Sequence, residues 1–257
     1  MSLKLNISPC PNDTFAFEAL LHGKTGIDLP QLDVRFLDIE ELNQQALKGI
    51  PDISKISYSI LGQISDKYVL LESGSALGRA NGQLLIRRAD FKGKIKRVAS
   101  PGLHTTANAL LKRYFPDVEE IVPMLFSDIA QYVNNGLADA GVLIHEGRFL
   151  YKDQGLELVA DLGKLWEKET ALPLPLGAIV IKRDIKEPIR RLFDEALKRS
   201  VRYAWDHPEQ NKAFIKEHAQ EMDDTVIEKH IHLFVNNFTE SLEEEGHAAV
   251  DHFLRVI

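Results

Sequence analysis

Two blocks of the sequence repeat each other in the same order, and this repeat constrains the fold more than any other feature. Segment 8–14 reads SPCPNDT and segment 100–106 reads SPGLHTT, and each leads into a predicted helix that contains Ala-Leu-Leu. Farther along, segment 49–58 (GIPDISKISY) is matched by segment 136–145 (GLADAGVLIH). A pattern that is used twice predicts two similar α/β lobes. Each lobe would offer a helix N-terminus and a strand end to a shared cleft.

Apolar stretches that are typical of strands alternate with helical stretches, and the chain after residue 186 reads as helical. This alternation predicts an α/β fold. Because a late strand at 177–181 is expected to return to the first lobe, that lobe would be discontinuous. We expect residues 1–88 plus 178–257 in the first lobe and residues 89–177 in the second, with the ligand between them.

The composition narrows the classes of partner. The 257 residues carry a net charge of −7 without a basic block, which argues against nucleic acid or an anionic membrane surface as a partner. No run approaches the roughly 18 apolar residues of a membrane span. The N-terminal residues lack the apolar stretch of a secretory signal, so we expect a cytoplasmic protein. The expected partner is a small-molecule carboxylate, and the expected state is a monomer or a homodimer.

Each Ser-Pro loop precedes a helix N-terminus, where free N–H groups and the helix dipole favour an anion. Asn12 and Asp13 stand at the first helix. In the second loop Gly102 permits close approach of a ligand to the backbone, and Thr105 and Thr106 add hydroxyl donors. One interpretation is a grip for a carboxylate or phosphate. The other is that Asp13 and one of the threonines only cap their helices.

Two side chains at strand ends are candidates for chemistry. Lys55 falls within an apolar segment, where an unpaired charge is costly, so it is expected to face the cleft or to pair with an acid; a surface lysine is the alternative. His145 ends an apolar strand at the position that Ser57 and Tyr58 occupy in the first repeat. Because the pKa of an unperturbed histidine lies near neutrality, His145 is placed for general acid–base work, although a lone histidine is often structural.

The remaining histidines and the single cysteine give weaker signals. His104 lies in the second Ser-Pro loop and is a secondary candidate. Cys10 precedes a helix N-terminus, which lowers the pKa of a thiol, but no histidine is near it in sequence, so we interpret it as a packing residue rather than a nucleophile. Seven histidines on predicted helices or at their ends read as surface or packing residues: His22, His207, His218, His230, His232, His247 and His252.

Several motifs are absent from the sequence. It has no phosphate-binding Walker motif, no G-x-G-x-x-G, no H-E-x-x-H, no Cys/His spacing typical of a metal site and no glycine-flanked serine elbow. These absences argue against nucleotide-driven and metal-dependent chemistry. We therefore expect no cofactor and no metal.

Five segments together resemble the 1,4-dihydroxy-6-naphthoate synthases, enzymes of the futalosine route to menaquinone. The segments are 8–15, 52–58, 73–78, 101–107 and 137–146, of which SPCPNDT is the most specific. The resemblance implies a fold like that of type 2 periplasmic binding proteins. It implies a lyase that converts cyclic de-hypoxanthine futalosine to 1,4-dihydroxy-6-naphthoate and a dihydroxyacetone fragment. It also implies that His145 is the proton acceptor. The residues implied to line the substrate site are Lys55, Ile56, Ser57, Thr105, Thr106 and Ala107.

Three other classes share this fold and remain alternatives. A solute-binding protein would hold a small carboxylate without chemistry, but the missing signal sequence argues against it. A chorismate dehydratase belongs to the same pathway, although the SPCPNDT start favours the naphthoate synthase. A sensor domain of the LysR type would follow a helix-turn-helix, and none precedes the first strand.

Overall fold

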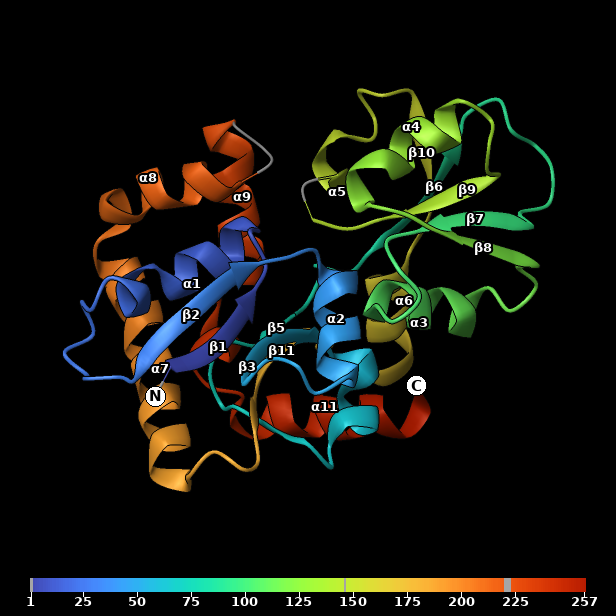
Figure 1. Cartoon of the computed structure of the whole chain (residues 1–257). Coiled ribbons are helices and arrows are strands. Elements are labelled where there is room, and N and C mark those ends of the chain that lie inside the picture. Colours follow the sequence, from blue (N-terminus) through green and yellow to red (C-terminus); the bar gives the residue numbers. More distant parts are fainter. Residues whose placement is uncertain (1, 146, 220–222) are drawn as a thin grey trace.

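The computed structural model describes residues 2–145, 147–219 and 223–257, and it arranges them in two α/β lobes that lie side by side (Figure 1). The first lobe is built on a six-stranded sheet in the order β2-β1-β3-β11-β4, with β5 paired to β11. Strand β1 is parallel to both β2 and β3, whereas β11 is antiparallel to β3, β4 and β5. The strands are β1 (Ser2–Ile7), β2 (Gln31–Phe36), β3 (Ile53–Ser57), β4 (Tyr68–Leu70), β5 (Ala76–Gly78) and β11 (Leu174–Lys182).

The second lobe is built on a five-stranded sheet in the order β10-β6-β9-β7-β8. Strand β7 is parallel to β8 and β9, and β6 is antiparallel to β9 and β10. The strands are β6 (Leu84–Arg88), β7 (Arg97–Ser100), β8 (Glu120–Pro123), β9 (Ala140–Leu143) and β10 (Leu156–Asp161). The predicted α/β class with two lobes is confirmed.

The division of the chain between the sheets differs from the expected boundaries. Strand β6 was expected in the first lobe, yet residues 84–87 pair with residues 140–143 of β9 in the second sheet. Strand β11 joins the first sheet from Leu174 onward, before the expected boundary at 178. The chain therefore changes sheets between residues 78 and 84 and again between 161 and 174. The second copy of the sequence repeat begins after β6, so the repeat did not indicate the partner of this strand.

The helices of the first lobe come from both ends of the chain. Helix α1 packs against three helices of the C-terminal tail, α7, α8 and α9, and its residues 11–20 are all buried. The tail thus covers the segment that carries the first Ser-Pro loop. The helices are α1 (Pro11–Leu21), α2 (Ile39–Leu47), the 3-10 helix η1 (Tyr58–Ile64), α7 (Glu187–Asp206), α8 (Pro208–His218), α9 (Asp224–Phe234), α10 (Asn237–Glu240) and α11 (Glu243–Val256).

Two helices of the second lobe link the sheets. Helix α6 was missed by the sequence analysis; Asp161 caps it by accepting a hydrogen bond from the N–H of Lys164. Both α3 and α6 contact β11 of the first sheet and a strand of the second (Figure 1). One buried cluster includes Ile56, Leu110, Val142 and Trp166, so the two sheets share a continuous core. The helices here are α3 (Thr106–Tyr114), η2 (Phe126–Asp128), α4 (Ile129–Asn134), α5 (Gly147–Leu150) and α6 (Leu162–Thr170).

The helices differ from membrane spans in length or in polarity. In the described ranges, none of them is both long enough and apolar enough to cross a bilayer.

Candidate functional site

A cavity lies between the lobes, at the carboxyl ends of strands from both sheets. It encloses about 700 Å³, part of which is open to solvent, a size that suits a small-molecule ligand. Strands β1, β3 and β9 end at it, and the loop that follows β7 contributes Thr105, as expected for an α/β fold. Eight of the predicted residues line it together: Asn12, Asp13, Lys55, Ser57, Thr105, Thr106, Ala107 and His145.

Two predicted substrate contacts, Ile56 and Gly102, do not line the cavity. Alternation along β3 turns Lys55 and Ser57 toward the cavity, and Ile56 packs into the shared core instead. Gly102 has a φ of +133°, and a side chain there would collide with Glu40. The glycine therefore brings the second Ser-Pro loop close to α2, not to a ligand.

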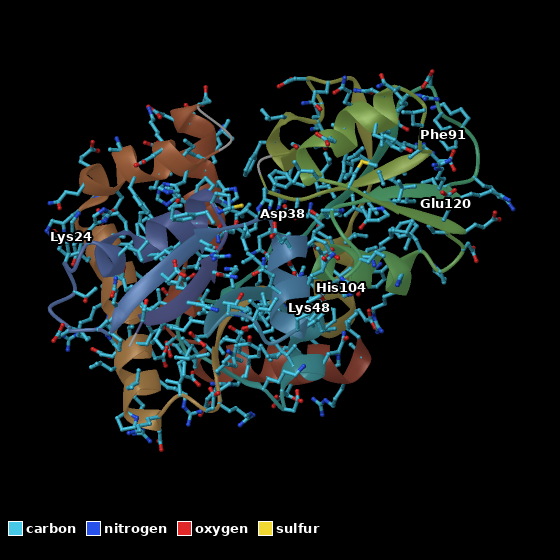
Figure 2. All side chains as sticks on the ribbon, in the orientation of Figure 1. Lys24, Asp38, Lys48, Phe91, His104 and Glu120 are labelled. Carbon is cyan, nitrogen blue, oxygen red and sulfur yellow. The ribbon has the colours of Figure 1, made fainter. Side chains whose placement is uncertain are left out.

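His104, the secondary candidate, also lies outside the cavity wall and binds α2. Its Nδ1 is 2.6 Å from Oε1 of Glu40, and its backbone N–H donates to Oε2 of the same carboxylate at 3.0 Å. Its carbonyl oxygen accepts hydrogen bonds from Asn43 and Ser59. Figure 2 shows His104 beside α2. These bonds fasten the second loop to the first lobe.

The two Ser-Pro loops differ in their capacity for an anion. In the first loop, Asp13 already places a carboxylate in the first turn of α1, so this helix N-terminus is occupied by the chain's own negative charge. In the second, Thr105 caps α3 by accepting from the N–H of Asn108, and the hydroxyl of Thr106 donates to the carbonyl of Leu176. The N–H groups of Thr106 and Ala107 begin the helix and have no intrahelical acceptor. Of the two predicted anion grips, the second is the one whose helix has no acidic side chain in its first turn.

A buried polar chain runs along one side of the cavity. The ammonium of Lys55 lies 2.7 Å from Oδ1 of Asp13, and both side chains are almost completely buried (6% and 4% exposed). Nδ2 of Asn12 donates to the same Oδ1 at 2.8 Å, and Oδ1 of Asn12 lies 3.0 Å from Nε2 of His230. Lys55 therefore pairs with an acid and faces the cavity at the same time.

His145 stands where β9 ends and carries a strained backbone. Its φ of +51° is uncommon for a residue with a side chain, and such strain concentrates at functional sites. The ring packs edge-on against Phe126, with 4.8 Å between the ring centroids. Burial, and to a smaller extent the nearby positive charge of Lys55, lowers the pKa of His145 to about 4. The imidazole is therefore neutral at physiological pH and available as a base.

Cys10 reaches this site from the other lobe. Its Sγ is 3.6 Å from Nε2 of His145, although 135 residues separate the two in sequence. The interpretation of Cys10 as a packing residue rested on the absence of a neighbouring histidine in sequence, and the fold removes that reason. The contact places a thiol beside the candidate base.

Two further cationic or titratable groups, which the sequence did not indicate, lie at or beside the site. Arg148 lines the cavity, and its guanidinium donates to the carbonyls of Gly82 and Ala80. Burial lowers the pKa of Arg148. His230, interpreted as a surface or packing residue, stacks on His145 with 5.9 Å between ring centroids. Neither residue belongs to a recognisable motif. Arg148 follows His145 by three residues in sequence and lies on α5, whereas the packing of α9 on α1 brings His230 to His145. Glu146, which neighbours His145, lies outside the described residues.

No group of three or more His, Cys, Asp or Glu side chains in the described ranges is arranged so that it could hold a metal ion.

Comparison with known proteins assigns the family. Residues 3–257 match the profile of a family described as menaquinone biosynthesis. Two relatives carry the name 1,4-dihydroxy-6-naphthoate synthase. The protein from Streptomyces coelicolor is 44% identical over 97% of this chain and 90% of its own length. The protein from Thermus thermophilus is 46% identical over 97% of this chain and 91% of its own.

Solved structures agree with the architecture. Protein AF1704 from Archaeoglobus fulgidus superposes with a TM-score of 0.93 at 32% identity, covering 99% of this chain and 96% of that one. The Candida albicans CA3427 gene product, described as having the generic periplasmic-binding-protein fold, superposes with a TM-score of 0.74 at 10% identity, covering 100% and 90%. The predicted two-lobed, periplasmic-binding-protein-like fold is confirmed. The chain belongs to the 1,4-dihydroxy-6-naphthoate synthase family of menaquinone biosynthesis.

Proposed function

We propose that this protein is a carbon–carbon lyase that converts cyclic de-hypoxanthine futalosine to 1,4-dihydroxy-6-naphthoate and a dihydroxyacetone fragment. The observation that carries the proposal is that His145 and the N-terminus of α3 line the same cavity. The imidazole of His145 is neutral, and its backbone is strained. Family membership supports this reaction, and the geometry offers it a candidate base and a candidate site for a carboxylate.

The substrate carboxylate is proposed to bind at the start of α3. The N–H groups of Thr106 and Ala107 are open there, and the dipole of α3 favours negative charge. The cationic groups of Lys55 and Arg148 lie on the same cavity and would stabilise negative charge that develops on the substrate. The rest of the substrate would extend toward His145.

His145 is proposed to remove a proton from the bound substrate. The electron pair left by that proton forms a new double bond while the adjacent carbon–carbon bond breaks. The electrons of the broken bond stay on one of the two fragments, which takes the proton back from the imidazolium of His145, and the ring that remains becomes aromatic. A neutral imidazole is the form that accepts the proton, which agrees with the low pKa of His145.

The direct test is turnover of cyclic de-hypoxanthine futalosine by the purified protein, with the naphthoate product followed by chromatography and mass spectrometry. Chorismate is assayed in parallel because chorismate dehydratases are the enzymatic alternative. Naphthoate formation supports the proposal. Dehydration of chorismate, or binding of the naphthoate precursor without turnover, would contradict it.

The pH dependence of kcat/KM gives a second expectation. A base must be unprotonated to act, so activity is lost as pH falls through the pKa of His145. Because that pKa is lowered to about 4, we expect kcat/KM to stay level from neutrality to about pH 5, instead of falling near 6.5 as for an ordinary histidine. A midpoint between 6 and 7 would rule out this environment for the base.

Acid unfolding has to be separated from titration of the base in that experiment. Some histidines have a lower pKa in the folded protein than the value of about 6.5 in the unfolded chain. Below pH 6.5 the unfolded chain binds more protons at these histidines than the folded protein does, which favours unfolding. His145 and His230 are both of this kind, so their contribution to stability is present above pH 6.5 and is lost as pH falls below it. Circular dichroism at each pH identifies the range in which the protein stays folded.

A further inference from the structure

We propose that His230 is a positioning residue of the catalytic site: its donor nitrogen fixes Asn12 beside the Lys55–Asp13 pair, and its ring supports His145. The effect on turnover rests on the reaction proposed above. The geometric part stands on the contacts of the free protein. His230 is carried by α9 in the C-terminal tail and is 1% exposed.

The hydrogen bonds define which nitrogen of His230 carries the proton. Asp13 pairs with Lys55 through Oδ1, and the same oxygen accepts from Nδ2 of Asn12. The amide of Asn12 is therefore oriented with its oxygen toward His230, and that oxygen can only accept. Nε2 of His230 must donate in this bond of 3.0 Å, which leaves Nδ1 as the unprotonated nitrogen.

The ring of His230 packs against the ring of His145. The two rings are stacked, with an interplanar angle of 22°, and Phe234 packs on His230 from the same helix. The charged or titratable groups that bear on this pair are Lys55, Arg148 and Asp13, together with the thiol of Cys10. Burial and the nearby cationic groups lower the pKa of His230, so its ring stays neutral. A neutral neighbour does not oppose the positive charge that His145 gains when it takes a proton.

Packing alone does not explain a histidine at this position. Nδ1 of His230 is buried and has no hydrogen-bond partner in the described part of the chain. An unsatisfied buried polar atom is destabilising, and a phenylalanine would fill the same space without it. The donor at Nε2 is the feature that phenylalanine cannot supply.

Two substitutions separate the donor from the ring. His230→Gln places an amide N–H near the position of Nε2 and removes the ring. His230→Phe keeps the ring against His145 and removes the donor. The pKa of His145 is followed by NMR of ¹⁵N-labelled imidazoles, with its signal assigned by comparison with His145→Asn, and KM and kcat are measured with cyclic de-hypoxanthine futalosine. Melting temperatures are recorded for both variants.

We expect the two variants to change different quantities. His230→Gln opens space beside His145, relieves part of its burial and raises its pKa by about one unit, with KM nearly unchanged. His230→Phe leaves the pKa of His145 in place and raises KM about tenfold, because Asn12 no longer steadies the Lys55–Asp13 pair. If His230→Phe does not fold, Asn12→Ala breaks the same bond from the other side.

A merely structural role would lower the melting temperature of both variants and leave the pKa of His145 and KM unchanged, which would overturn the proposal. An equal rise in KM in both variants would overturn the role of the donor. The titration needs no substrate. If the wild-type protein does not turn over the naphthoate precursor, the proposed function fails, and the pKa of His145 in His230→Gln still decides whether the ring supports the base.

Discussion

His145→Asn is expected to lower kcat by about 10²- to 10⁴-fold, the usual contribution of a general base. The backbone of His145 has a φ of +51°, a conformation that asparagine adopts more readily than most residues, so this substitution removes the basic nitrogen with little added strain. KM should change little, because the proposed grip on the carboxylate lies at the start of α3. Steady-state kinetics with cyclic de-hypoxanthine futalosine measure both parameters.

A matched control is available on the surface. His247 is exposed and pairs with Glu72, and neither residue lines the cavity. His247→Asn should therefore leave kcat within about twofold, as surface substitutions usually have small effects. Turnover by His145→Asn close to that of this control would remove His145 from the proposed role. In that event Cys10 and Asp13 would be the next groups to test as proton acceptors, since each lies within or beside the same cavity.

Lys55→Met is expected to destabilise the protein by about 3–5 kcal/mol, because it leaves the carboxylate of Asp13 buried without its cation. Both members of this pair are almost fully buried, and Oδ2 of Asp13 has no hydrogen-bond partner among the described residues. The free energy of unfolding is measured by urea denaturation. The variant should also bind the substrate more weakly, since Lys55 lines the cavity.

The double variant Lys55→Met/Asp13→Asn tests the cause of that loss. Removing both charges eliminates the unpaired carboxylate, so the double variant should recover at least half of the lost stability. As a surface control, Arg199→Met breaks an exposed pair with Glu195 on α7 and should cost no more than about 1 kcal/mol. A loss in Lys55→Met no larger than in this control would show that the buried pair adds nothing to stability.

The sequence predicted the part of the site that is encoded locally. Strand ends and helix starts placed Asp13, Lys55, Thr105 and His145 around one cleft, because the carboxyl ends of strands carry the ligand sites of α/β folds. The same alternation could have separated Lys55 from Ile56, since successive side chains of a strand point to opposite faces. The family resemblance implied that Lys55, Ile56 and Ser57 all line the substrate site. Because side chains alternate along β3, Lys55 and Ser57 face the cavity and Ile56 faces the core.

The remainder of the site depends on contacts between distant parts of the chain. Cys10 and His145 are far apart in sequence, and His230 reaches His145 only because α9 packs on α1. The first Ser-Pro loop matches the second in sequence. Asp13, however, adds a negative charge to the first loop, and a site for an anion requires a positive one. The partner of Gly102 is Glu40 on α2, which no local pattern indicates.

The core that joins the two sheets bears on how this chain folds. Although the sequence repeats, α3 and α6 bury Leu110 and Trp166 in one cluster with residues of the first sheet, such as Ile56. A fragment that spans the second sheet alone would expose this apolar surface to water and lose much of its driving force for folding. The two halves of the repeat are consequently not modules that could be excised or exchanged. The protein should melt in one cooperative transition. A destabilising substitution in either half should therefore lower the melting temperature of the whole protein.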